Sequence, residues 1–75
     1  MTERLVDARG LKCPLPVMKA AKVLRDMRAG EVLRVLATDP GAPLDFADLC
    51  ASRGHQLLES RDAEGMFDCV ICAGE

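Results

Sequence analysis

Asp7-Ala8-Arg9-Gly10-Leu11-Lys12-Cys13-Pro14-Leu15-Pro16 is the segment around which the rest of the chain is organised. It follows a short apolar run that ends at Val6 and precedes a helix-patterned stretch that begins at Val17. Proline lacks a backbone N–H and is tolerated best in the first turn of a helix, so the two prolines predict a helix start here. The segment is therefore predicted to join a strand to a helix, with Cys13 at the junction.

Cys13 has the sequence surroundings of a reactive thiol. Because it precedes a proline, extended geometry is favoured, which suits a helix N-cap. In that position the Leu15 N–H would face the sulfur and the helix dipole would add positive potential. Arg9 and Lys12 add positive charge nearby in the sequence. The pKa of Cys13 is therefore predicted to lie below the roughly 8.5 of a free cysteine. Leu15 also precedes a proline, and a helix that starts only at Pro16 would weaken the dipole effect.

A lone cysteine in a small domain is usually a buried apolar residue, but a polar, charged loop with two prolines favours a reactive Cys13. The other three cysteines have patterns typical of packing. Cys50 lies on the apolar face of a predicted helix. Cys69 and Cys72 are three residues apart in a predicted strand, so they point to opposite faces and a disulfide is disfavoured. Cys69 is predicted to be core, and Cys72 edge or surface. A zinc site would need a second ligand pair besides them, and only Cys13, Cys50 and His55 remain, so no metal is expected.

The composition is that of one small domain, residues 1–75, with an aliphatic core. Of the 75 residues 49% are hydrophobic, with two phenylalanines, no tryptophan and no tyrosine. A net charge of -2 and so few aromatics argue against direct binding of nucleic acid. No apolar run approaches the roughly 20 residues of a membrane span, and no signal-peptide pattern opens the chain. A cytoplasmic protein with reduced cysteines is therefore expected.

The first half of the chain predicts a strand–helix–strand unit. Leu5-Val6 reads as a short strand, with residues 1–3 expected to fray. In residues 14–28 apolar side chains recur at helical spacing, and Gly30 is expected to supply a left-handed cap. Residues 31–37 form a nearly continuous aliphatic run, typical of a central strand. A unit of this length implies a right-handed crossover and parallel pairing of the two strands.

The second half predicts a short helix and a hairpin. After a turn cluster, Pro43 is an early helical residue, Asp45 lies in the first turn and Gly54 ends the helix. Residues 56–61 and 66–72 flank a turn-forming segment and read as an antiparallel hairpin. The order is then β-α-β-α-β-β, which predicts an α/β two-layer sandwich. Its four-stranded mixed sheet would carry both helices on one face.

Two further side chains and one basic cluster are open to more than one interpretation. Asp39 is predicted to cap the second helix, with shaping of the Cys13 loop as the alternative. His55, after the helix-ending glycine, is typical of a turn or surface position rather than of a ligand or base. A basic set is either a solvated helix face or a docking surface for an acidic partner; it comprises Lys12, Lys19, Lys22 and Arg25.

The segment from Gly10 to Pro16, with Asp7 and Arg9 before it, resembles the Cys-Pro-x-Pro signature of the TusA (SirA-like) sulfur-carrier family. The resemblance continues through residues 37–42, and then through Asp45, Cys50 and Gly54-His55. It implies a two-layer α/β fold and a cysteine that carries sulfur as a persulfide, the position held here by Cys13. The residues expected to support Cys13 are Arg9, Gly10, Lys12, Pro14, Pro16 and Asp39.

The expected function is that of a sulfur carrier. A donor such as a cysteine desulfurase or a rhodanese-like protein would pass sulfane sulfur to Cys13, and the persulfide would relay it to an acceptor protein. No cofactor is expected, and the chain lacks the residue sets of a self-contained enzyme, so it is a sulfurtransferase-type relay. The alternative is a redox-sensing or regulatory interaction domain.

Two positions depart from the family pattern. Leu49 stands where many members carry tryptophan, which affects packing detail. Leu15 stands where the branch devoted to tRNA thiolation carries an acidic residue, and this weakens assignment to that pathway.

Overall fold

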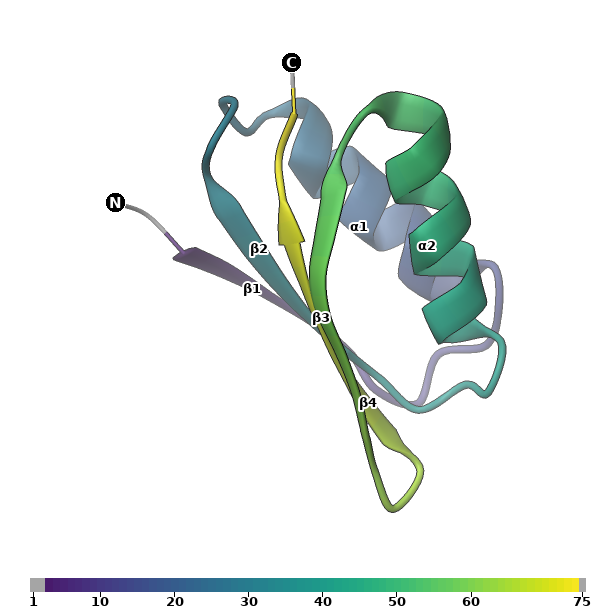
Figure 1. The fold of residues 1–75 in the computed structure, drawn as a ribbon. Coiled ribbons are helices and arrows are strands. Elements are labelled where there is room, and N and C mark those ends of the chain that lie inside the picture. Colours follow the sequence, from purple (N-terminus) through teal and green to yellow (C-terminus); the bar gives the residue numbers. More distant parts are fainter. Residues whose placement is uncertain (1–2, 75) are drawn as a thin grey trace.

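The computed structural model describes residues 3–74 and has the predicted order of elements (Figure 1). The elements are β1 (Glu3–Ala8), α1 (Leu15–Arg25), β2 (Val32–Ala37), α2 (Ala42–Arg53), β3 (Gln56–Ala63) and β4 (Met66–Cys72).

The four strands form one mixed sheet in the order β1-β2-β4-β3. The first two strands run parallel, with Val6 opposite Val35, as expected for strands joined through a helix. The other pairs are antiparallel, with Cys69 of β4 opposite Val35 on one side and Ser60 on the other. Both helices cover the same face of the sheet (Figure 1). The predicted two-layer α/β sandwich is therefore confirmed.

The core lies between the helices and the covered face of the sheet. In β2 every second residue is buried, namely Leu33, Val35 and Ala37, as the two-residue period of a strand requires. The helices contribute their apolar stripes, and Phe46 of α2 is the largest fully buried side chain. Among the described residues no polar or charged side chain is buried. Among the described residues, the buried core is thus mainly aliphatic, with one aromatic ring and the sulfur-containing side chains of Met27, Cys50 and Cys69.

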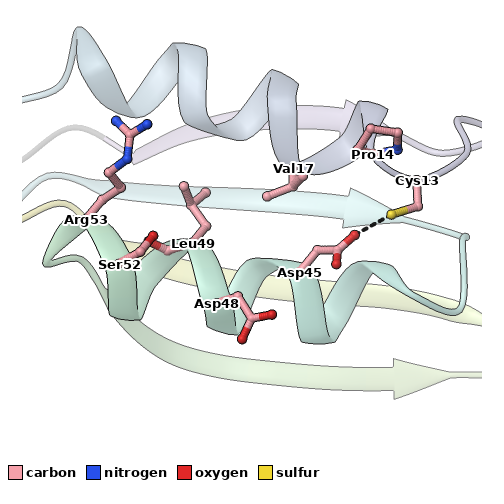
Figure 2. A pocket seen from close by; sticks show the side chains of 8 residues that line it. All are labelled: Cys13, Pro14, Val17, Asp45, Asp48, Leu49, Ser52 and Arg53. Carbon is pink, nitrogen blue, oxygen red and sulfur yellow. Dashed lines mark hydrogen bonds between the residues drawn. The ribbon is translucent and has the colours of Figure 1, made fainter.

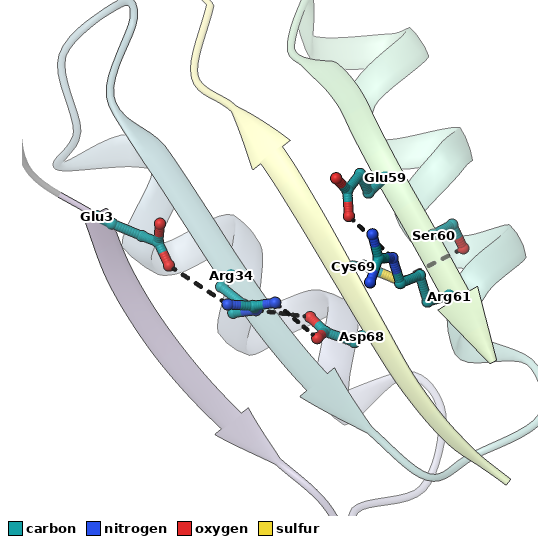
Figure 3. A network of polar contacts seen from close by, with 7 residues as sticks. All are labelled: Glu3, Arg34, Glu59, Ser60, Arg61, Asp68 and Cys69. Atoms are coloured by element: carbon teal, nitrogen blue, oxygen red, sulfur yellow. Dashed lines mark hydrogen bonds and ion pairs between the residues drawn. The ribbon is translucent and has the colours of Figure 1, made fainter. Parts of the chain in front are cut away.

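The other face of the sheet carries a network of charges (Figure 3). Arg34 of β2 makes two hydrogen bonds to Asp68 of β4, at 2.9 and 3.0 Å, and lies 3.8 Å from Glu3. Arg61 pairs with Glu59 on β3 at 3.1 Å. The central strand can hold an arginine because this side chain points away from the helices and remains 42% exposed.

Helix α1 is shorter than predicted at both ends. Pro14 is its N-cap, so the helix begins at Leu15, and it ends at Arg25 instead of continuing to residue 28. Beyond the end, the N–H groups of Asp26 and Met27 bond to carbonyls three residues back, which closes tight turns in place of helix. Gly30 does adopt a positive φ of 92°, but it turns the chain into β2 instead of capping the helix.

Three strand boundaries also differ from the predicted ones. Glu3, expected to fray, pairs with Val32 in β1, whereas Met1 and Thr2 lie outside the described residues. β2 begins at Val32, one residue later than predicted. β3 continues to Ala63, so the hairpin turns in two residues. Those two residues, 64 and 65, have φ of 54° and 85°, the positive pair that tight hairpin turns require.

Candidate functional site

Cys13 lies where the N-terminal ends of the two helices approach each other (Figure 2). The loop after β1 carries it to the start of α1, and its side chain is exposed. Pro16, in the first turn of α1, is fully buried and fixes that turn against the core. Pro14, the N-cap residue, is exposed, and the Cys13–Pro14 peptide bond is cis. A buried proline thus anchors a loop whose thiol faces outward.

The predicted role of Cys13 as helix N-cap is wrong. Pro14 holds that position, and no side chain caps the helix. The Leu15 N–H, expected to face the sulfur, donates to the Lys12 carbonyl oxygen at 2.8 Å. Pro16 has no N–H to offer. The sulfur therefore has few backbone N–H donors at the start of α1, because two of these residues are prolines and the Leu15 N–H is already bonded.

Asp45 is the partner of the thiol that the sequence did not reveal. It lies in the first turn of α2, as predicted, and the Cys13 Sγ donates a hydrogen bond to its Oδ2 (Figure 2). The two residues are 32 positions apart, so only the packing of α2 beside α1 brings them together. In the sequence, the only indication of a role for Asp45 was that it belongs to the residues that resemble the sulfur-carrier family.

The electrostatics of Cys13 are the reverse of those predicted. The hydrogen bond to Asp45 raises the pKa of the Cys13 thiol, and so do desolvation and the charges of Asp45 and Asp39. A helix N-terminus is equivalent to roughly half a positive charge spread over its first turn. A full carboxylate in contact with the sulfur outweighs it. The unpartnered protein therefore favours the thiol form of Cys13.

Arg9 and Lys12 do not supply the positive charge expected of them. Arg9 is paired with Asp7 through two side-chain hydrogen bonds of 2.9 and 2.8 Å. This pairing lowers the pKa of Asp7 to about 2. Lys12 is exposed, and its carbonyl oxygen holds the turn that leads into α1. Both residues lie near Cys13 in the sequence, but Arg9 pairs with the end of β1 and the Lys12 carbonyl oxygen bonds to the start of α1.

Gly10 ties the Cys13 loop to the loop that precedes α2, and Asp39 shapes that second loop. Gly10 has a φ of 81°, a conformation that favours glycine, and its N–H donates to the Thr38 hydroxyl at 2.9 Å. Asp39 does not cap α2, whose N-cap is Gly41; its Oδ2 instead accepts the Gly41 N–H at 2.9 Å. A Cβ placed on Gly41 would lie 4.0 Å from that of Cys13. The alternative role of Asp39, shaping the surroundings of Cys13, is the one this geometry favours.

A groove runs from Cys13 along the line between the two helices (Figure 2). Its volume is about 420 Å³, and Val17 and Leu49 give it apolar walls. Asp45 and Asp48 lie on the side nearer the thiol, whereas Arg53 lies at the far end (Figure 2). Three large apolar side chains near this end of the helices are exposed: Leu15, Met18 and Leu44. The thiol is thus at the mouth of a surface that another protein segment can contact.

The other three thiols lie in less accessible positions. Cys50 is 4% exposed and Cys69 is fully buried, and burial raises the pKa of both. Cys72 is half-buried at the end of β4, which has a strand on each side, so of its two predicted positions, edge or surface, the edge position is wrong. All four cysteines are free thiols. Cys13 is therefore the accessible one.

His55 is a structural turn residue, as predicted. Its Nδ1 accepts the Gly74 N–H at 2.9 Å and so ties the end of β4 to the turn after α2. Within residues 3–74, no group of three histidine, cysteine or acidic side chains is placed to hold a metal ion. None of the helices described here is long and apolar enough to cross a membrane.

The basic set lies on the Cys13 loop and on α1, and all four of its side chains are exposed: Lys12, Lys19, Lys22 and Arg25. This degree of exposure is compatible with a solvated face and with a docking surface, so both interpretations of this set stay predictions.

The sequence and the fold of this chain match those of known proteins. Residues 4–73 match the family model described as sulfurtransferase TusA. A Neisseria meningitidis protein described as a candidate sulfur carrier is 48% identical over 71 residues, which are 95% of this chain and 96% of that protein. Sulfur carrier protein TusA of Allochromatium vinosum is 46% identical over 66 residues, 88% of this chain and 87% of that one.

A solved structure agrees with these sequence matches. The crystal structure of the SirA-like protein of Desulfitobacterium hafniense has a TM-score of 0.83 and 30% identity, and it covers 99% of this chain and 100% of that one. The fold and the site define a small α/β protein with one accessible cysteine. The chain belongs to the TusA family.

Proposed function

We propose that this protein is a sulfur carrier in which Cys13 accepts sulfane sulfur as a persulfide and passes it to an acceptor protein. The exposure of Cys13 at the mouth of the inter-helix groove supports this function most directly, because Cys50 and Cys69 are buried and Cys72 is half-buried. Relatives named as sulfur carriers, at 44–46% identity, support the same role.

The transfer needs only the thiol and a donor persulfide. The Cys13 thiolate attacks the outer sulfur of the donor's cysteine persulfide, and the bond between the donor's two sulfurs breaks. The electron pair of that bond leaves with the donor's thiolate, which takes up the proton that Cys13 lost. The same exchange in reverse roles delivers the sulfur to an acceptor thiol. No electrons are gained or lost overall, so no redox cofactor or metal is required.

The partners proposed are a sulfur-donor protein, such as a cysteine desulfurase or a rhodanese-like protein, and a sulfur-acceptor protein. The exposed leucines and methionine beside Cys13 offer apolar area for such transient contacts. A relay of this kind needs thiols that stay reduced, a condition that the cytoplasm provides. Supporting roles fall to Gly10, Pro16 and Asp39, which fix the loop, more than to Arg9 and Lys12.

A redox sensor, the alternative function, fits this geometry less well. Redox-sensing cysteines are accessible and have a low pKa, because the thiolate is the form that oxidants attack. Cys13 is accessible, but Asp45 raises its pKa. A sulfur carrier does not need a low thiol pKa in the free protein. Its thiol reacts inside a complex with the donor, where charges of the donor also act on it.

Mass spectrometry after incubation with a cysteine desulfurase and cysteine tests the function. The protein should gain the mass of one sulfur on Cys13, and a thiol reductant should remove it. Cys13→Ser should gain none, whereas Cys72→Ser, the matched loss of a half-buried thiol, should load as the parent does. Loading of Cys13→Ser to the same extent would contradict the proposed function.

A further inference from the structure

The hydrogen bond between Cys13 and Asp45 is the closest polar contact of the reacting sulfur. Asp45 is half-buried in the first turn of α2, and the next residue, Phe46, is fully buried. The carboxylate is therefore held on a rigid element and not on a mobile surface chain. Its Oδ2 accepts the Cys13 Sγ–H across the gap between the helices (Figure 2).

The charged groups around the thiol are mostly acidic. Asp45 on α2 and Asp39 on the preceding loop both act on Cys13, and Asp48 lies one helical turn further along the groove. Arg53 also lines the groove, but at its far end (Figure 2). On the Cys13 loop itself, Arg9 is bound to Asp7 and Lys12 is exposed to solvent. A thiolate formed at this place would lose its hydrogen bond and lie against a carboxylate.

Provided that the chain carries sulfur as proposed above, we infer that Asp45 controls when Cys13 can react: its carboxylate holds the proton on the unloaded thiol until loading begins. The thiol form is a poor nucleophile, so the unloaded carrier is protected from oxidants and alkylating metabolites. Direct contact with the reacting sulfur makes Asp45 a catalytic residue of the carrier. The raised pKa of Cys13 agrees with this role.

The loading step balances with Asp45 in this role. The proton leaves Cys13 Sγ as the sulfur attacks the outer sulfur of the donor persulfide. The sulfur–sulfur bond of the donor breaks, and its electron pair stays on the donor's thiolate. That thiolate accepts the proton, so a thiol and a persulfide are converted into a persulfide and a thiol. The Asp45 carboxylate is unchanged at the end.

Alkylation of Cys13 by iodoacetamide as a function of pH tests this inference without any sulfur donor. In Asp45→Asn the midpoint of the pH profile should move to lower pH. If the midpoint falls by about one pH unit, the thiolate fraction at neutral pH rises about tenfold while its nucleophilicity falls about threefold, so alkylation should be about three times faster. Asp48→Asn is the matched control, because it removes the same charge from the same helix and groove but not the hydrogen bond. Its profile should follow that of the parent.

A second measurement follows loading of Cys13 by glutathione persulfide at neutral pH. Asp45→Asn should load faster than the parent and than Asp48→Asn. Asp45→Ala serves as the second variant if the amide does not fold, as judged by thermal unfolding. An unchanged midpoint in both Asp45 variants, or an equal change in Asp48→Asn, would overturn the inference, and so would faster alkylation without faster loading. Absence of loading in every protein would instead contradict the carrier function, because the alkylation profiles do not depend on it.

Discussion

Replacement of Phe46 should weaken the attachment of α2 to the sheet more than any other single change in that helix. Its ring is fully buried and is the largest such side chain in the described residues. Truncation of a buried phenylalanine to alanine costs about 3–5 kcal/mol. A domain of this length has a total stability of roughly 4–11 kcal/mol, so Phe46→Ala should lose a large part of it. Phe46→Leu keeps most of the volume and should cost about 1–1.5 kcal/mol.

Urea denaturation followed by circular dichroism measures both costs. With an m-value of about 1 kcal/mol/M for so small a domain, Phe46→Leu should move the midpoint down by about 1 M. Leu44→Ala is the control on the same helix, because Leu44 is 68% exposed and its loss should change stability by less than about 0.5 kcal/mol. A cost of Phe46→Ala below about 1 kcal/mol, at an unchanged m-value, would refute the view that this ring anchors α2.

Two further changes separate stability from sulfur loading. Cys69→Ala removes a fully buried sulfur and should lower the free energy of unfolding, measured by urea denaturation, by about 1 kcal/mol. The folded variant should still load sulfur on Cys13 at the parent's rate. Loss of loading would mean that a second thiol takes part. Gly74→Ala would place a Cβ 1.8 Å from the Gly54 carbonyl oxygen, so the backbone must move. The free energy of unfolding should fall by about 2 kcal/mol or more. An unchanged free energy of unfolding in urea denaturation would contradict this close packing.

The fold was predictable because its signals are local. The aliphatic run of β2 predicted a central strand, and the helix between β1 and β2 predicted their parallel pairing. Gly54 was expected to end α2, and it does so in the left-handed conformation. Each of these features follows from the periodicity of a short segment or from the chemistry of one residue.

The boundaries that were predicted wrongly depend on contacts between segments. The apolar spacing after residue 25 remains helical in the sequence, and Met27 is indeed buried, but the backbone there forms tight turns. The reason lies in the connection to β2, where Gly30 donates its N–H to the Ala73 carbonyl oxygen at 2.8 Å. An amphipathic pattern shows which side chains are buried, but it does not show where a hydrogen bond to another segment ends the helix.

The residues next to Cys13 in the sequence were enough to identify the site, but they did not predict the direction in which the pKa of the thiol is shifted. Cys13 stands out in the sequence because two prolines and charged residues surround it, and the structure places it in the open as that pattern indicated. Its pKa was predicted from features near it in the chain, namely the start of the following helix, the Leu15 N–H and the charges of Arg9 and Lys12. The groups that act on it are neighbours in space, because α2 packs beside α1 and presents Asp45 to the sulfur.

The consequence for the mechanism is that a helix end and the carboxylate it carries act in opposite directions on one thiol. The N-terminal ends of α1 and α2 both favour negative charge nearby, and α2 satisfies its own end with Asp45 in its first turn. That carboxylate then occupies the place where a thiolate would otherwise be stabilised. Removal of the Asp45 charge would leave two helix ends facing Cys13 with no acidic residue in contact with the sulfur. The fold therefore places two helix ends beside the thiol, and the hydrogen bond to Asp45 is the largest of the effects that raise the pKa of Cys13 against them.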